Sequence, residues 1–284
     1  MRDARPSATA YRVAIRRAAH QVLDNPKVLD DPVALPIVGP EAAARLREGT
    51  DDQQGRFARA VRAFMVGRSR FAEDELASAI ERGARQYVIL GAGLDTFAYR
   101  NPHAFGTLRI FEVDHPATQE WKRGRLAAAG IAAPESVTYV PVDFETQTLT
   151  EELARAGFRS ETVTFFSWLG VTMYLEPTAI NATLEFIAST PPGGGVVFDY
   201  AIPRSSLSWI GRMALDAVSR RVARAGEPFR TFFDPPELAK QVRAMGFGYV
   251  EDLGKDEINE RYFKNRADGL QVSGSLGRLM AARL

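Results

Sequence analysis

The chain has 284 residues, of which 45% are hydrophobic and 25% are charged, and its formal net charge is +1. This length suits one large globular domain or a domain with an elaboration, and the near-neutral charge with scattered arginines argues against nucleic acid as a partner. With no cysteine, and with His20, His103 and His115 at no metal-like spacing, the sequence excludes disulfides and thiol nucleophiles and predicts no metal site.

The first part of the chain predicts a helical cap over residues 1–86. Helix-like segments run from Ser7 to Leu23, from Glu41 to Arg47 and, as one or two helices, from Phe57 to Ile80. The first residues lack the apolar segment of a signal peptide, and no run reaches the ~18 apolar residues of a membrane helix. We therefore expect a soluble, cytoplasmic protein with no membrane partner.

Two arginines, Arg68 and Arg70, lie in the last of these segments, close to where the chain enters the expected sheet. An arginine on a helix most often belongs to a solvated face. The alternative is that one of the two holds a ligand carboxylate through both arms of its guanidinium group.

A short apolar run from Tyr87 to Leu90 predicts a buried strand, and Gly91-Ala92-Gly93 follows it at once. Glycines at the carboxyl end of a strand let a ligand lie against bare backbone, and the start of a following helix supplies free N–H groups. Asp95 and Thr96 offer capping side chains for such a helix. Because strand–Gly–x–Gly turns also occur as tight connections without a ligand, the glycines alone favour binding only slightly.

An acidic residue ends the next predicted strand. Leu108 to Val113 is apolar and is followed by Asp114, 23 residues after Gly91. A carboxylate in this place can accept hydrogen bonds from both hydroxyls of a ribose. It can also cap the helix that Pro116 begins, and the two roles are compatible.

The third predicted strand, Val137 to Val142, ends in Asp143-Phe144. An acid at this position can meet the amino group of an adenine while the phenyl ring packs on the face of the base. Since parallel strands end at one edge of a sheet, the glycines, Asp114 and this pair together predict an adenosine-shaped pocket.

The remaining chain continues the alternation of strand and helix. We therefore predict an α/β fold with a doubly wound, mostly parallel seven-stranded sheet, a core over residues 87–284 and a helical insertion at about 205–225. The further strands are expected at Thr162–Leu169, at Val196–Tyr200, which ends in Asp199-Tyr200, at Phe247–Leu253 and, after a polar stretch from Gly254 to Gly277, at Leu279–Leu284.

Four of these motifs resemble those of class I S-adenosylmethionine-dependent methyltransferases and, more narrowly, the leucine carboxyl methyltransferase-like branch. That branch includes many actinobacterial proteins and some polyketide O-methyltransferases, and the resemblance covers the whole chain. It implies a Rossmann-like core with a helical cap. The motifs are Val88-Ile-Leu-Gly-Ala-Gly-Leu-Asp-Thr-Phe-Ala-Tyr-Arg100, Phe111-Glu-Val-Asp-His-Pro116, Val142-Asp-Phe144 and Phe165-Phe-Ser-Trp-Leu-Gly-Val-Thr-Met-Tyr-Leu175.

The resemblance implies that the glycines lie against the methionine part of the cofactor, that Asp114 binds the ribose and that the Asp-Phe pair binds the adenine. It also implies a basic residue on the cofactor carboxylate, for which Arg68 is the nearest match and Arg17 the second. The family's carboxyl methyltransferases carry a glutamate where this chain has Leu169, which argues against a protein-phosphatase-type substrate. The predicted cofactor-binding residues are Arg17, Arg68, Gly91, Ala92, Gly93, Asp114, His115, Asp143, Phe144 and Leu169.

The expected reaction transfers a methyl group from S-adenosylmethionine, leaving S-adenosylhomocysteine, to a carboxylate or phenolic hydroxyl of a small molecule, with secondary metabolism and a polyketide-like acceptor as the setting. The cofactor is already activated, so the sequence needs no catalytic motif, and we assign none. One alternative is an NAD(P)-dependent oxidoreductase, although Thr96 stands where the third glycine belongs. Another is a catalytically silent cofactor-binding scaffold. We expect a monomer or homodimer, with Tyr11, Tyr174, Tyr200 and Trp209 as candidate lining of the acceptor pocket.

Overall fold

Seven strands form one sheet, in the order β3-β2-β1-β4-β5-β7-β6, in the computed structural model, which describes residues 7–103, 106–143, 146–224 and 228–284. Neighbouring strands from β3 to β5 are parallel, whereas β7 runs antiparallel to β5 and to β6. The predicted doubly wound, mostly parallel sheet is thereby confirmed. The strands are β1 (Gln86–Leu90), β2 (Arg109–Asp114), β3 (Val137–Pro141), β4 (Thr164–Trp168), β5 (Gly195–Ala201), β6 (Tyr249–Leu253) and β7 (Gly277–Arg283).

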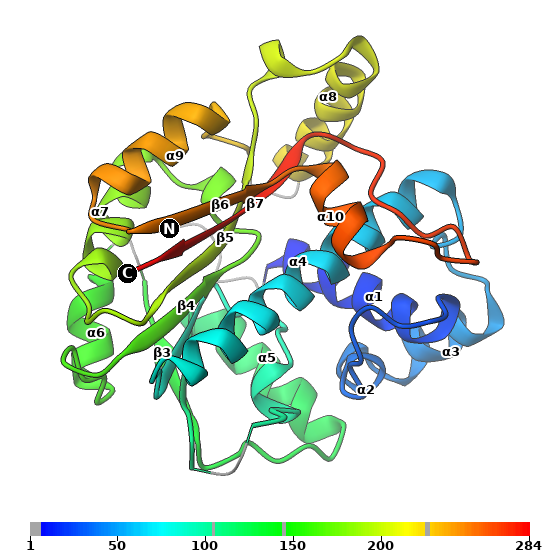
Figure 1. Cartoon of the computed structure of the whole chain (residues 1–284). Helices are drawn as coiled ribbons and strands as arrows, with labels where there is room; N and C mark the ends of the chain where they lie inside the picture. The colour runs from blue at the N-terminus through cyan, green and yellow to red at the C-terminus, as the bar shows by residue number, and fades with distance from the viewer. Residues whose placement is uncertain (1–6, 104–105, 144–145, 225–227) are drawn as a thin grey trace.

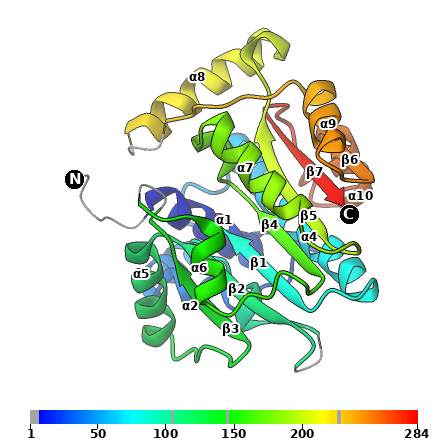
Figure 2. The same cartoon turned by 90° about the vertical axis from the view of Figure 1, so that its left-hand side faces the viewer.

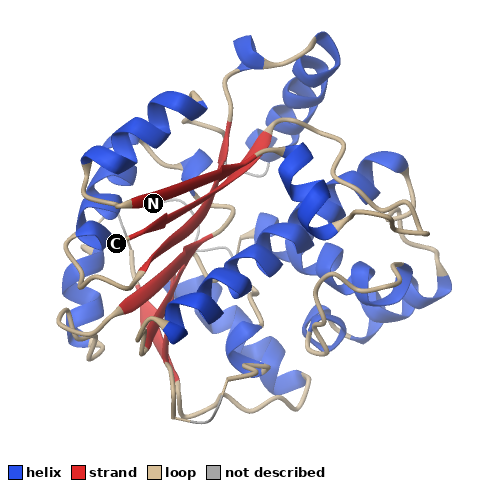
Figure 3. Ribbon diagram, viewed as in Figure 1, coloured by secondary structure: helices blue, strands red, loops and turns tan. Residues whose placement is uncertain are grey.

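Helices cover both faces of the sheet (Figures 1 and 3). One face carries α4 (Arg56–Glu81), α5 (Pro116–Ala128) and α10 (Lys255–Tyr262), and the other carries α6 (Leu149–Arg155), α7 (Pro177–Ala188) and α9 (Pro235–Ala244). The side chains of β1 alternate between the two layers, with Tyr87 and Ile89 in the α4 layer and Val88 and Leu90 in the layer of α6 and α7. Burial on both faces explains why this strand is apolar throughout.

A smaller group of helices packs beside the α4 layer: α1 (Ala8–Leu23), α2 (Ala34–Val38) and α3 (Pro40–Glu48). These three share an apolar cluster of their own, which also takes in Leu94 and Leu126. In contrast, α4 packs directly on the sheet and is one continuous helix through Gly67, where an added Cβ would lie 3.3 Å from Ile258 Cγ2 and 3.3 Å from Phe263 Cε2. The division into a cap over 1–86 and a core over 87–284 stays a prediction.

Two segments differ from the expectation from sequence. The glycine-rich turn after β1 leads into one turn of 3₁₀ helix, η1 (Phe97–Tyr99), instead of an α-helix, and Asp95 Oδ1 accepts a hydrogen bond from the N–H of Phe97 at 2.8 Å. The polar stretch after Gly254 contains α10, in which Ile258 is fully buried. One buried residue in two helical turns is too weak a pattern for a periodicity argument to detect.

The helical insertion after β5 consists of η3 (Arg204–Ser206) and α8 (Trp209–Arg224). In both views α8 stands off from the sheet, beyond the ends of the central strands (Figures 1 and 2). None of the helices in the described part of the chain is long and apolar enough to cross a membrane.

Candidate functional site

The turn after β1 is closely covered by two other segments. Gly91 has φ +67° and Gly93 has φ +48°, a backbone conformation that favours glycine. A Cβ on Gly91 would lie 2.4 Å from Val171 Cγ2, and one on Gly93 would lie 3.0 Å from the Cβ of Ala10 on α1. Both glycines are therefore required by the backbone angle and by the lack of space. The turn lies at the carboxyl edge of the sheet, where Val171 and Ala10 pack against it.

The carboxylate of Asp114 is oriented by that turn. Its Oδ2 accepts a hydrogen bond from the N–H of Gly93 at 2.5 Å, and its Oδ1 accepts one from the N–H of His115 at 2.7 Å. A carboxylate has about four acceptor positions, so capacity remains for ribose hydroxyls. Burial raises the pKa of Asp114, and the two backbone hydrogen bonds oppose that rise.

The second acid of the predicted site, Asp143, lies next along the same edge. Val142 donates its N–H to the carbonyl of Asp114 at 2.9 Å, which brings Asp143 beside the end of β2. Phe144, the predicted adenine-stacking ring, lies outside the described residues. His115 is exposed and caps α5, because its Nδ1 accepts a hydrogen bond from Ala117 N–H at 3.2 Å. The capping role that the sequence offered to Asp114 is therefore filled by His115.

Arg17, the second choice for the cofactor carboxylate, is buried, and both of its terminal nitrogens are engaged. Nη1 donates to Asp95 Oδ2 at 3.3 Å, Nη2 donates to the carbonyl of Leu94, and Nε lies 3.7 Å from Asp31 Oδ2. Arg17 therefore ties α1 to the turn after β1.

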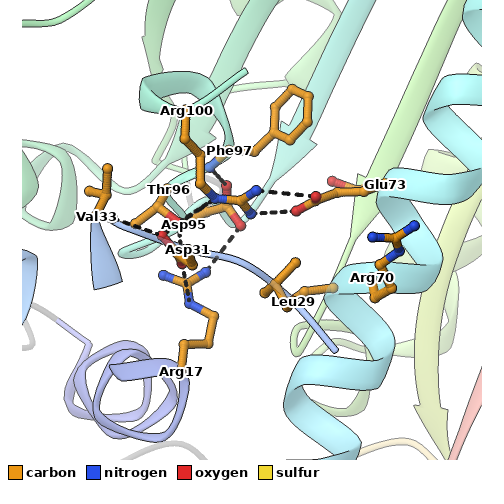
Figure 4. A network of polar contacts seen from close by, with 12 residues as sticks. Arg17, Leu29, Asp31, Val33, Arg70, Glu73, Asp95, Thr96, Phe97 and Arg100 are labelled. Atoms are coloured by element: carbon orange, nitrogen blue, oxygen red, sulfur yellow. Dashed lines mark hydrogen bonds and ion pairs between the residues drawn. The ribbon is translucent and has the colours of Figure 1, made fainter. Parts of the chain in front are cut away.

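Asp31 is the centre of a wider buried network (Figure 4). It is fully buried and accepts hydrogen bonds from Thr96 Oγ1 at 2.6 Å and from Val33 N–H at 3.2 Å, besides its ion pair with Arg17. Arg100 Nε lies 3.4 Å from Asp31, and its terminal nitrogens bind both oxygens of Glu73 on α4. The network joins α1, the Asp31 turn, the segment after β1 and α4 into one unit.

Arg68, the first choice, differs from Arg17 in that the described residues engage only one of its terminal nitrogens. It is 5% exposed, and Nη1 donates to Asp199 Oδ2 at 2.6 Å. Its Nε is buried and has no partner among the residues that the structure describes. Arg70, by contrast, forms an exposed ion pair with Asp74. Of this pair of arginines, Arg68 is therefore the one whose buried donors suit a ligand carboxylate.

The loop after β4 completes this corner of the edge. Leu169 packs against the apolar layer of α4, and the N–H of Gly170 donates to Asp199 Oδ1 at 2.5 Å. Gly170 has φ +76°, and a Cβ there would lie 2.9 Å from Arg68 Nη2. Sequence reasoning placed Asp199 at the end of a strand but gave it no role. The sequence did contain a signal for a role in the site, because Asp199 is an acid near the carboxyl end of β5 and this end lies at the same edge of the sheet as Asp114.

A second buried polar cluster is structural. His20 Nδ1 lies 2.8 Å from Asp24 Oδ2, and Arg62 donates to both oxygens of Asp24 at 2.7 and 2.8 Å. His20 Nε2 accepts hydrogen bonds from the backbone N–H groups of Val28 and Leu29. Both ring nitrogens are therefore used in contacts within the N-terminal part of the chain. Within the described ranges, no group of three or more metal-binding side chains gathers.

Sequence comparison identifies relatives along the whole chain. Residues 10–188 match the leucine carboxyl methyltransferase family profile. YktD of Bacillus subtilis (strain 168), a predicted S-adenosyl-L-methionine-dependent methyltransferase, is 30% identical over 305 aligned positions that cover all of both chains. A predicted S-adenosyl-L-methionine-dependent methyltransferase from Mycobacterium marinum (strain ATCC BAA-535 / M) is 35% identical over 68% of this chain and 65% of its own length.

A solved structure shares the fold. A predicted methyltransferase from Thermobifida fusca YX superposes with a TM-score of 0.57 at 16% identity, covering 99% of this chain and 96% of that one. The sheet order and the relatives define an S-adenosylmethionine-dependent methyltransferase of class I fold. Within that class, the chain belongs to the leucine carboxyl methyltransferase family. The expected enzyme class and cofactor are confirmed, and the oxidoreductase alternative is set aside.

Proposed function

We propose that this enzyme methylates an oxygen atom, either a carboxylate or a phenolic hydroxyl, of a small molecule. The observation that carries the site is the convergence of the glycine turn at Gly91 and Gly93, the oriented carboxylate of Asp114 and the buried, unused Nε of Arg68 at one edge of the sheet. Each of these groups matches one part of S-adenosylmethionine: the methionine chain, the ribose and the carboxylate.

The roles of the chain's own residues follow from these contacts. Asp114 accepts hydrogen bonds from the ribose hydroxyls, and Arg68 donates to the carboxylate of the methionine part. The bound sulfonium supplies an activated methyl group, so the protein's remaining work is to align the acceptor oxygen behind it and to exclude water. A carboxylate acceptor needs no general base, whereas a phenol benefits from one.

An aromatic cluster near the same edge supports an apolar acceptor. Tyr174 in η2 (Thr172–Tyr174) packs on Phe229 with ring centroids 5.5 Å apart, and Phe229 packs on Phe232 at 6.1 Å. All three rings are only partly buried. Of the other aromatic residues expected to line the pocket, Tyr200 is fully buried and donates its hydroxyl to Asp252, so it belongs to the core.

The wider setting is also proposed. We assign the enzyme to secondary metabolism in the cytoplasm, with a polyketide-like acceptor, acting as a monomer or homodimer without nucleic acid or membrane partners. The partly buried aromatic cluster supports the acceptor class, and the near-neutral net charge of +1 supports the absence of nucleic acid.

Isothermal titration with S-adenosylhomocysteine, with NADH as the control ligand, tests the cofactor site first. Incubation with methyl-labelled S-adenosylmethionine and a panel of carboxylic acids and phenols then tests the acceptor. Mild alkali distinguishes the products, because it hydrolyses a methyl ester and leaves an aryl methyl ether intact. Binding without transfer to either class of acceptor would contradict the proposed reaction and favour the silent scaffold.

A further inference from the structure

We infer that Asp199 is a positioning residue, which holds the guanidinium group of Arg68 in the place and orientation that receive the cofactor carboxylate. This inference rests on the role proposed for Arg68. Asp199 lies on β5 and Arg68 on α4, 131 residues apart in sequence.

The pair is isolated from solvent. Asp199 is 1% exposed and Arg68 is 5% exposed, and Arg68 Nη1 lies 2.6 Å from Asp199 Oδ2. A guanidinium group buried without a counter-charge would be strongly disfavoured, so Arg68 can remain at this edge because Asp199 is there. Only one of the three nitrogens of Arg68 donates to Asp199, and Nε stays without a partner among the described side chains.

Asp199 is itself fixed from two sides. Its Oδ1 accepts the N–H of Gly170 at 2.5 Å, and its backbone carbonyl accepts the hydroxyl of Thr172 at 2.6 Å. Both partners belong to the loop after β4. The left-handed backbone at Gly170 brings that loop against the guanidinium group, where no side chain would fit. Asp199 thus holds Arg68 and the loop together from one carboxylate, with one oxygen for each.

The same helix offers a matched control. Glu75, also on α4 and also buried, accepts hydrogen bonds from both Arg283 Nε and Nη2 at 2.8 Å. Arg283 on β7 pairs in register with Gly195, the first residue of β5, whereas Asp199 lies near the opposite end of that strand. Glu75 therefore ties the same helix to the sheet, away from the edge that carries Asp114. If substitution of Glu75 and substitution of Asp199 weaken ligand binding equally, the cause is looser attachment of α4 to the sheet and not the positioning of Arg68.

The test compares Asp199→Asn with Glu75→Gln by isothermal titration of two ligands. S-adenosylhomocysteine carries the amino-acid carboxylate, and 5′-methylthioadenosine has the adenosine and sulfur without it. We expect Asp199→Asn to weaken the affinity for S-adenosylhomocysteine at least tenfold and to change the affinity for methylthioadenosine less than twofold. Glu75→Gln should change neither affinity by more than twofold. If Asp199→Asn lost affinity equally for both ligands, or for neither, the inference would be overturned.

A second comparison covers the case in which Asp199→Asn alone does not fold. The double variant Arg68→Gln/Asp199→Asn leaves no unpaired buried charge, so it is compared with Arg68→Gln alone. If Asp199 acts through Arg68, both bind S-adenosylhomocysteine within twofold of each other. If the double variant bound S-adenosylhomocysteine ten times more weakly than Arg68→Gln alone, Asp199 would not act through Arg68. Failure of the wild-type protein to bind S-adenosylhomocysteine would instead reject the proposed cofactor role of Arg68.

Discussion

Single carboxylates at the sheet edge are oriented by the backbone before any ligand binds. Asp114 accepts N–H groups from Gly93 and His115, one on each oxygen. This fixes the plane of the carboxylate and leaves its other acceptor positions free. Pre-orientation of this kind reduces the entropy lost on binding.

The cofactor affinity is expected to depend on pH through Asp114. Burial raises the pKa of this carboxyl above its ordinary value of 3.8, so the acceptor form is lost at a higher pH than for an exposed aspartate. The affinity for S-adenosylhomocysteine should be constant near neutral pH and fall on acidification, at a higher pH than an exposed aspartate would give. Titration calorimetry across this range measures it.

The matched variant is Asp114→Asn, which cannot ionise. Loss of charge-assisted hydrogen bonds of about 1.5–3 kcal/mol predicts an affinity roughly 10- to 100-fold weaker at neutral pH, with no acid midpoint from this group. A wild-type affinity that does not fall on acidification, or a variant that keeps the same acid dependence, would show that another group controls binding.

Much of this edge could be predicted residue by residue. Asp114 and Asp143 follow apolar runs, and parallel strands bring such ends together, so their proximity follows from the pattern. The Arg68–Asp199 pair could not be found in this way, because no short-range rule relates a residue on α4 to one on β5. The same holds for the contacts of Arg17 with Leu94, Asp95 and Asp31, which only the folded arrangement reveals.

At the scale of elements, a buried charge network attaches α1 and α4 to the segment after β1. Asp31 lies between α1 and α2 and contacts Arg17, Arg100 and Thr96, so three segments depend on one carboxylate. Its sequence neighbour Asp30 is exposed and lies 3.7 Å from the exposed Lys27. Two adjacent aspartates thus have opposite environments.

Asp31→Asn should lower the free energy of unfolding by about 3 kcal/mol or more, because two buried guanidinium groups lose a counter-charge. Asp30→Asn should change it by less than about 0.5 kcal/mol, since the pair is exposed to solvent. Urea denaturation of both variants measures the difference. Equal effects of the two substitutions would mean that the network does not support the cap.

Element types were predictable where the apolar pattern was strong. The central strands β1, β4 and β5 are buried along their whole length, and their apolar runs show this directly. The sequence did not predict the 3₁₀ turn η1. Asp95 accepts a hydrogen bond from the N–H of Phe97, and a capping side chain can make such a local bond at the start of an α-helix or of a 3₁₀ turn. α4 is continuous through Gly67, whose lack of a side chain leaves room for Ile258 and Phe263, nearly 200 residues later in the chain.

At the scale of the whole molecule, β7 connects the two parts of the sheet. It lies between β5 and β6, and Ala281 pairs with Val197 on one side and with Glu251 on the other. The edge strand β6 pairs with β7 alone in the described sheet. Disruption of β7 therefore affects every strand from β5 outward.

Ala281→Pro should reduce the free energy of unfolding by more than about 3 kcal/mol, because proline removes a ladder N–H inside the sheet. The control Ala281→Gly keeps that N–H and should cost only about 1 kcal/mol. Thermal and urea unfolding compare the two. Similar losses would show that the side chain of Ala281, and not its backbone hydrogen bond, is what matters.

The position of β7 also has a consequence for biosynthesis. Met280 pairs with both Phe198 and Asp252, and it follows Asp252 by 28 residues. At about 5–20 residues per second, the ribosome needs roughly 1–6 seconds to make that interval. Throughout it, the outer edge of β5 and the whole of β6 have no hydrogen-bonded neighbour, and unpaired strands of this kind recruit other chains. The period in which a nascent copy most needs protection by chaperones therefore lies between the translation of β6 and that of β7.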